Sequence, residues 1–310
     1  MGEALIDVVH YPDGSTHATP GGSPANVAVA LGRLGRPVHL VTQWGADAYG
    51  DLLASWLAES SVEVTRLGPD EVPTAMATAR LDAGGSASYE FTFDWQIAQI
   101  GESARFLHVG SLGALHEPGA RQVRELVRAQ AGQGLVSYDP NVRPGLVENR
   151  HETVLAVEDF VGLSDVVKAS DEDLEFLYPD EEPLDAAERW LYRGPAMVIV
   201  THGGGGATAL VGRARLHVPG VSVQVVDTVG AGDTFMAAFI DGLIRTGPWK
   251  ETMVDVRGVR TEMVEQLVRH AVTASSITVG RCGMDPPHAA ELPLLPGPVA
   301  ARAHHRSDEG

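Results

Sequence analysis

The segment from Val225 to Phe235, VVDTVGAGDTF, joins the end of a predicted strand, through a turn of small residues, to the start of a very apolar helix. Gly230 and Gly232 let a ligand approach the backbone, and the first turn of a helix has free N–H groups that favour an anion such as phosphate. A lone carboxylate facing a phosphate would repel it, so Asp233 is better suited to accept the proton of an attacking hydroxyl group. This interpretation predicts phosphoryl transfer. Taken alone, such a segment is more often a simple turn with a helix-stabilising acid.

A second segment, Gly21–Asn26, places two glycines before another predicted helix. We expect Ser23 to cap that helix and Pro24 to occupy its first position. Asn26 offers both a donor and an acceptor to a polyol. The alternatives are a plain loop with a cap, or the nucleophile elbow of a hydrolase. The elbow requires a strand immediately before it and a small residue in a strained turn, and Thr19-Pro20 before the serine and Pro24 after it argue against this alternative.

Two further polar segments follow predicted strands. Asp139, Asn141 and Arg143 come directly after the apolar run Leu135–Tyr138. Ligands of open α/β sheets bind beyond the carboxyl ends of the strands, so these side chains could all reach one ligand. A proline-containing turn with an exposed arginine explains the same residues equally well.

Four consecutive glycines follow the predicted strand Met197–Thr201 and could let a nucleotide lie against the backbone. A dinucleotide-binding fingerprint would have to open a helix, whereas Ala207–Val211 has the composition of a strand. The alternative is a flexible hairpin. The candidate nucleotide-binding residues here are Thr201, His202, Gly203, Gly204, Gly205 and Gly206.

Strand-like and helix-like segments that alternate along the chain would position these residues. This alternation, with strands apolar on both faces, predicts an α/β fold whose parallel sheet is covered by helices on both sides. The remaining predicted strands are Val38–Thr42, Phe106–Val109 and Val166–Ala169. The predicted helices are Ala25–Leu34, with Gly35 as a left-handed stop, Asp47–Glu59, Ala120–Ala131, Glu152–Leu163 and Leu184–Tyr192.

Two segments do not fit a parallel sheet. Val8–Thr19 surrounds Asp13-Gly14, and a second pair of strand-like runs, Thr74–Leu81 and Ala87–Phe93, flanks Asp82–Gly85. Both patterns are typical of antiparallel hairpins. We expect them to form a small β flap beside the main sheet, although two separate surface hairpins would give the same pattern. The second hairpin has one apolar face, which we expect either the sugar site or a second subunit to cover.

Composition excludes several classes of protein. The 310 residues include 41 acidic and 23 basic side chains, a formal charge of −18, which argues against binding to nucleic acid or to anionic membranes. A single cysteine, Cys282, excludes an internal disulfide. The only lysines, Lys168 and Lys250, lack the context of a phosphate-binding P-loop. No apolar run is long enough to span a membrane and no secretory signal is evident, so we expect a cytoplasmic protein.

In chain order, these segments resemble the ribokinase/PfkB family of sugar kinases over nearly the whole length. Gly21–Gly35 and Asp227–Phe235 resemble its two signatures. The segments similar to the fructokinase branch are Gly2–Asp7, Asp139–Arg143, Lys168–Leu174 and Ala274–Pro287. The resemblance implies a three-layer α/β/α sandwich of the ribokinase type over residues 1–298. It also implies a β lid formed by hairpins at about 8–20 and 74–94, and leaves a polar tail at 299–310.

The resemblance also implies ATP, Mg²⁺ and a monovalent cation, usually K⁺. It makes Asp233 the base and assigns the anion hole to Gly230, Ala231 and Gly232. Sugar contacts fall to Asp7, Gly22, Asn26 and Asp233, to which we add Asp139, Asn141 and Arg143. ATP contacts fall to Ser170, Gly232 and residues 201–206. The K⁺ site would lie near Asp227 and Val229 and the backbone of Thr278, Arg281 and Gly283, with Asp173 linked indirectly to Mg²⁺.

The chain departs from the family at two places. Relatives have a β-strand before the equivalent of Gly2-Glu3, and Met1 occupies its last position. Their Asn-x-x-Glu motif is replaced here by Ser170–Asp173, which retains the acidic charge.

The resemblance as a whole leads us to expect an ATP-dependent fructokinase-like enzyme that phosphorylates the 6-hydroxyl of fructose and forms a homodimer through the lid. The alternatives are a 2-keto-3-deoxygluconate kinase, a ribokinase, a nucleoside kinase, or a sugar- or nucleotide-binding protein without turnover.

Overall fold

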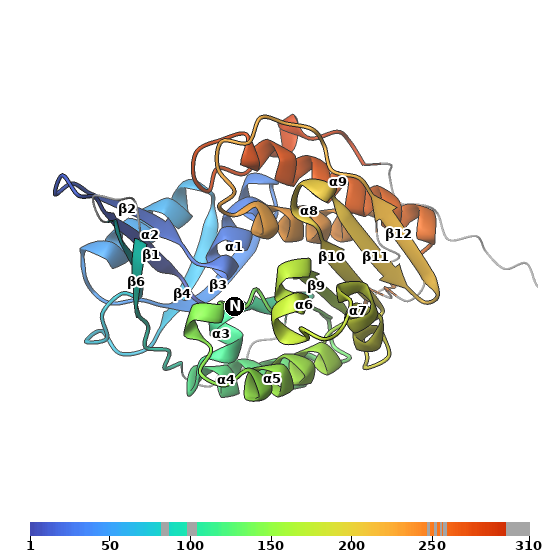
Figure 1. Cartoon of the computed structure of the whole chain (residues 1–310), viewed down its shortest axis with the longest axis horizontal. Coiled ribbons are helices and arrows are strands. Elements are labelled where there is room, and N and C mark those ends of the chain that lie inside the picture. The colour runs from blue at the N-terminus through green and yellow to red at the C-terminus, as the bar shows by residue number, and fades with distance from the viewer. Residues whose placement is uncertain are drawn as a thin grey trace, which may run out of the picture.

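The computed structural model describes residues 1–81, 87–97, 104–246, 249–250, 253–254, 256 and 259–295. Figure 1 shows the fold, in which a large sheet lies between two groups of helices and a smaller sheet projects at one end. The turn at 82–86 and the tail at 299–310 lie outside the described residues.

The larger sheet has six strands in the order β12-β11-β10-β9-β8-β7. The four strands from β7 to β10 are parallel, and β11 and β12 continue the sheet as antiparallel strands. This arrangement confirms the predicted parallel core. The strands are β7 (Phe106–Gly110), β8 (Leu135–Asp139), β9 (Val166–Ser170), β10 (Met197–Thr201), β11 (Ala207–Val211) and β12 (Ala214–Val218).

Helices cover both faces of this sheet, as the apolar runs require (Figure 1). One core lies between the sheet and α4 (Gly119–Gln130), α5 (Arg150–Leu163) and α7 (Pro183–Leu191). A second core lies between its other face and α8 (Ala231–Thr246) and α9 (Thr261–Val279). The remaining α-helices described are α1 (Ser23–Arg33), α2 (Ala48–Glu59), α3 (Ser111–Leu115) and α6 (Asp171–Leu177). No helix in the described ranges is long and apolar enough to cross a membrane.

The two predicted hairpins form one smaller sheet, in the order β2-β1-β5-β6. Each hairpin is antiparallel, and β1 joins the second hairpin through a parallel pairing with β5. The structure therefore confirms a single flap. Its strands are β1 (Leu5–His10), β2 (Thr16–Gly21), β5 (Met76–Leu81) and β6 (Ala87–Thr92).

A groove separates the larger sheet from a parallel pair formed by β3 (Val38–Gln43) and β4 (Val62–Leu67). Residues of β3 and β7 line this groove, which has a volume of about 350 Å³. The chain crosses its end, where the Met1 amino group donates to His108 O (2.6 Å) and Gly2 N donates to Val41 O (3.2 Å). Met1 thus lies where the last residue of the family's first strand is expected.

Three local predictions are wrong. Residues 219–226 are irregular rather than the end of a strand before Asp227. The N-cap of α1 is Gly22, because the Ser23 hydroxyl is used elsewhere. Thr19-Pro20 do belong to a strand, β2, so only Pro24, which follows the serine, still argues against the hydrolase elbow. Gly35, with φ +77°, ends α1 as predicted.

Candidate active site

The amino ends of α1 and α8 meet, and this contact joins residues that are more than 200 positions apart in the chain. Ser23 Oγ donates to Asp233 Oδ1 at 2.6 Å, and Asn26 Nδ2 donates to Asp233 Oδ2 at 2.7 Å. The Asp233 side chain is almost fully buried. Two donors therefore fix a carboxylate at the first turn of α8, and Ser23 serves this site rather than the cap of its own helix.

Glycines shape the backbone around this carboxylate. Gly230 has φ +71°, and a β-carbon there would collide with the Met284 sulfur. Gly22 has φ +101°, and a β-carbon there would meet the carbonyl of Glu3 at 2.7 Å. Among the described residues no backbone acceptor is found for the N–H groups of Gly232 and Asp233. Free N–H groups at the first turn of a helix are suited to bind an anion, as the predicted anion hole requires.

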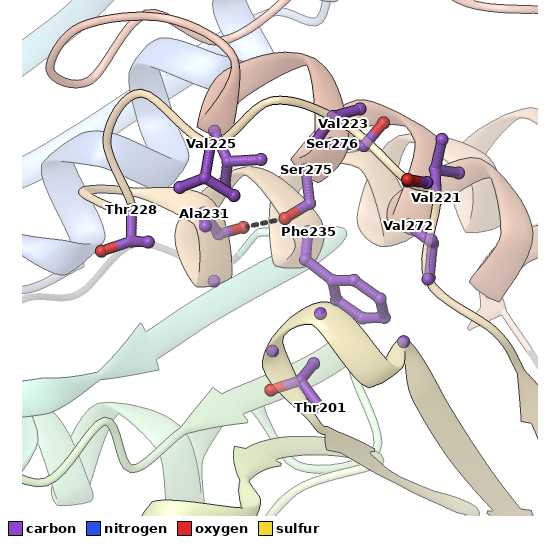
Figure 2. Close-up of a pocket in the computed structure, with 17 residues that line it drawn as sticks. Thr201, Val221, Val223, Val225, Thr228, Ala231, Phe235, Val272, Ser275 and Ser276 are labelled. Atoms are coloured by element: carbon purple, nitrogen blue, oxygen red, sulfur yellow. Dashed lines mark hydrogen bonds between the residues drawn. The ribbon is translucent and has the colours of Figure 1, made fainter.

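A pocket of about 350 Å³ leads to this turn (Figure 2). Its floor includes Thr201, several of the glycines that follow β10, and Ala231 and Gly232 of α8. Ser275 Oγ donates to Ala231 O at 2.9 Å and ties α9 to the turn (Figure 2). The volume is typical of a small-molecule site.

The pocket has apolar walls that the sequence analysis missed. Val221, Val223 and Val225 belong to the irregular segment before Asp227 and are 48%, 39% and 60% exposed. They line the pocket together with Phe235 and Val272 (Figure 2). Exposed apolar side chains gathered at one place mark a binding surface. The sequence analysis placed only the end of a strand before Asp227 and gave these valines no part in a binding site.

The predicted nucleotide-binding residues divide into two groups. Thr201, Gly203, Gly204, Gly206 and Gly232 line the pocket. Ser170, His202 and Gly205 are not among the residues that line it. The Ser170 hydroxyl caps α6, and the His202 ring contacts Asp171 and Thr208.

A polar cluster of Arg143, Asn141, Asp7 and Glu3 lies near the flap, in which Asp7 belongs to β1. Arg143 donates to Asn141 Oδ1 at 2.6 Å, and its charge acts on both Glu3 and Asp7. Burial raises the pKa of Glu3 to about 7, although Gly113 N donates to it at 2.8 Å. The Asp7 side chain is exposed. Arg143 thus contacts Asn141 and is near enough for its charge to act on Asp7, and Glu3 is a nearby acid that the sequence analysis missed.

Asp139 is not placed like a sugar ligand. Its side chain is fully buried at the end of β8, and it accepts a hydrogen bond from Lys168 Nζ at 2.7 Å. Burial alone would lower the pKa of Lys168, but the charges of Asp139, Asp173 and Asp233 outweigh burial and raise it. The two side chains therefore form a buried ion pair next to α8.

The carboxylates predicted to act near metal ions are both engaged by protein donors. Asp227 accepts from Val229 N (3.0 Å) and Gly283 N (2.9 Å), so it joins the turn before α8 to the loop after α9. Asp173 accepts from Val142 N (2.8 Å) and from the Ser170 backbone and hydroxyl. No cluster of three metal-binding side chains occurs among the described residues.

The other two residues of the predicted cation site lie beside Asp227. The Thr278 side chain is buried and its hydroxyl donates to Thr234 Oγ1 at 3.0 Å. Arg281 N donates to the Thr278 carbonyl at 2.9 Å, and the Arg281 guanidinium contacts Glu291. The predicted residues are therefore neighbours, and the oxygens available to a cation there are mainly backbone carbonyls.

A kinase that phosphorylates a small molecule is the class of protein that this fold and this site define. Residues 1–289 match the sequence profile described as "pfkB family carbohydrate kinase", and the chain belongs to this family. It is a carbohydrate kinase, a phosphotransferase with an alcohol group as acceptor, and its fold is the ribokinase-like α/β fold with a small β lid.

Relatives and solved structures agree with this assignment. A fructokinase of Rhizobium leguminosarum bv. trifolii is 33% identical over 257 residues, which are 78% of each chain. The structure of a fructokinase from Xylella fastidiosa with bound ATP has a TM-score of 0.77 at 28% identity, and the match covers 91% of this chain and 92% of that one. A double mutant of the Vibrio cholerae fructokinase, bound to fructose, ADP and a potassium ion, has a TM-score of 0.72 at 26% identity, covering 91% and 92%.

Proposed function

We propose that this sugar kinase transfers the γ-phosphoryl group of ATP to the 6-hydroxyl of fructose. The observation that carries the reaction is the buried Asp233 carboxylate, fixed by two donors at a turn whose N–H groups are free. The choice of fructose rests on the relatives, which are named fructokinases. The polar cluster of Asp7, Asn141 and Arg143 supplies groups suited to sugar hydroxyls.

In the proposed reaction Asp233 accepts the proton of the sugar hydroxyl while the hydroxyl oxygen forms a bond to the γ-phosphorus of ATP. The bond between that phosphorus and the ADP oxygen breaks, so ADP leaves with the electron pair. Free N–H groups at the first turn of α8 stabilise the charge on the transferring group. Ser23 and Asn26 hold the carboxylate in place, and the hydroxyl is expected to take over one of their hydrogen bonds.

The pocket has features that suit a nucleotide. Its valine walls match the apolar faces of a purine, and Gly203 and Gly204 have open space where a side chain would stand. Bound Mg²⁺ would neutralise phosphate charge in such a reaction. Asp173 already accepts three protein hydrogen bonds, so it could act on that ion only through water. We place K⁺ at the backbone oxygens around Asp227.

The test is ADP release by the purified chain with fructose, ribose, 2-keto-3-deoxygluconate, glucose and adenosine in separate reactions. We expect sugar-dependent ADP release that is greatest with fructose. A higher kcat/KM for another acceptor would replace fructose with that substrate. Nucleotide binding without turnover on any acceptor would instead favour a non-catalytic binding protein.

A further inference from the structure

One of the two lysines of the chain is buried in the larger sheet, where a charge is costly. Lys168 is the third residue of β9, and its side chain is 3% exposed. Its ion pair with Asp139 is buried as well. Replacing such a pair with uncharged side chains of similar size is often neutral or even stabilising. Stability alone therefore gives no reason for this pair, and its surroundings must be considered.

The ammonium group lies directly against the first turn of α8. A β-carbon added to Gly232 would be 3.0 Å from Lys168 Nζ, so the lysine approaches the turn where a side chain is missing. Gly232 also lines the nucleotide pocket, and the next residue is Asp233. Lys168 is therefore located where the pocket and the reacting carboxylate meet.

Lys168 also has donors to spare. An ammonium group carries three N–H donors. In the part of the chain that the structure describes, Asp139 Oδ2 is its one acceptor within hydrogen-bond distance. The pKa of Lys168 is raised, so the group is charged at neutral pH. A buried cation with two unused donors thus lies beside the turn that binds phosphate.

We propose that Lys168 is a catalytic residue that binds the transferring phosphoryl group from beneath the α8 turn, and that Asp139 positions its ammonium group. This inference rests on the proposed function. Phosphoryl transfer spreads negative charge over the oxygens of the transferring group. A preorganised cation in a site that excludes water stabilises this charge as it develops. Asp139 thereby serves the phosphate rather than the sugar.

The test is the double variant Lys168→Met/Asp139→Asn, which removes both charges and leaves neither one unpaired. We expect turnover with the best sugar to fall at least about 100-fold, as when a donor to a developing oxyanion is removed. The melting temperature and the affinity for AMP should change little. The affinity for ATP relative to AMP should fall, because AMP lacks the terminal phosphate that Lys168 binds.

The matched control is Arg121→Met/Glu125→Gln, which removes an exposed ion pair on α4, remote from the pocket, and should leave turnover and both affinities unchanged. Should the first double variant fail to fold, Lys168→Gln/Asp139→Asn makes the same comparison with a polar side chain of similar length in place of the lysine. Asp139→Asn alone should give a smaller loss of turnover, since the lysine remains but is no longer held.

The inference is overturned if a folded variant without the lysine turns over within a few-fold of the parent chain and keeps the parent ratio of ATP to AMP affinity. If the parent chain itself phosphorylates no acceptor, the proposed function fails. The two nucleotide affinities still decide in that case whether Lys168 binds the terminal phosphate, so the two failures can be distinguished.

Discussion

At the scale of single residues, the chemistry depends on a carboxylate that other side chains hold in place. Ser23 and Asn26 reach Asp233 from a different helix, and both of their hydrogen bonds are short. Pairing with neutral donors keeps the carboxylate available as an acceptor without a competing cation bound to it. The site can therefore be tested by removing the proton acceptor alone.

We predict that Asp233→Asn lowers turnover by about 10²- to 10⁴-fold, the usual contribution of a general base. Nucleotide affinity should hold or increase, because a negative charge near the phosphates disappears. The comparison is kcat against the dissociation constant of ATP. If Asp233 only stabilised its helix, the change would cost about 1 kcal/mol of stability at most and turnover would survive.

Acid should destabilise the protein through a partly buried histidine in β7. Burial, followed by the nearby charges of the chain's amino group and Lys168, lowers the pKa of His108 to about 3. The unfolded chain binds this proton at about pH 6.5. Stability from the neutral ring is therefore complete above pH 6.5 and is lost as the pH falls towards 3.

We predict that His108→Leu weakens this pH dependence. The slope of the unfolding free energy between pH 6.5 and 4 should be smaller in the variant than in the parent chain, as measured by urea denaturation at several pH values. The exposed His151 provides the control, since His151→Gln should leave the slope unchanged. Equal slopes in the parent and His108→Leu would contradict the prediction.

At the scale of elements, the turn before α8 is braced by the loop after α9. Asp227 accepts from N–H groups on both sides, and Val226 N donates to Val279 O at 2.8 Å. An ion bound to the carbonyl oxygens of these segments would stabilise the same turn that forms the anion hole. A potassium effect on the rate is the expected result.

We predict that adding potassium to a cation-depleted assay raises kcat/KM, whereas adding the same concentration of a bulky organic cation does not. Asp227→Asn should reduce the potassium response, because the hydrogen bonds that join the turn before α8 to the loop after α9 become weaker. An unchanged rate over the potassium titration would remove the cation site from the proposal and would leave the kinase assignment intact.

The elements were largely predictable, whereas the pairing of side chains between them was not. Helices and strands such as α2 and β10 follow from apolar periodicity, which is a local property. The contact between Lys168 and Asp139 depends on the register of neighbouring strands, which no local pattern specifies. The valines at 221–225 line the pocket from an irregular segment, and no sequence pattern distinguishes side chains that contact a ligand from those that contact a core.

At the scale of the whole molecule, β2 and β6 form the edges of the lid sheet, and no strand of the described residues outside this sheet pairs with them. Phe91 and Phe93 pack in part against Leu5, Ala75 and Leu112 of the same chain, which covers some of the apolar face. Free strand edges can still pair with a second copy. The proposal of a homodimer through the lid therefore rests on the edges as well as on the apolar face.

We predict a particle of twice 32.8 kDa by multi-angle light scattering at micromolar concentration. Thr92→Pro, on the edge strand β6, removes a backbone donor and should shift the particle towards the monomer. Thr65→Pro changes β4, which lies outside the lid, and serves as the comparison. A monomer at every concentration tested would exclude a stable dimer.

The groove between β3 and β7 divides the molecule into two parts that share no continuous ladder of strand hydrogen bonds. Local opening of a protein occurs first where backbone hydrogen bonds are few. We therefore predict that deuterium enters the amides of residues 38–43 and 106–110 sooner than those of 166–170, which lie between two paired strands. Mass spectrometry of peptic fragments measures this order. Equal protection would mean that the two parts open as one cooperative unit, whereas the predicted order would make this groove the boundary between two foldons.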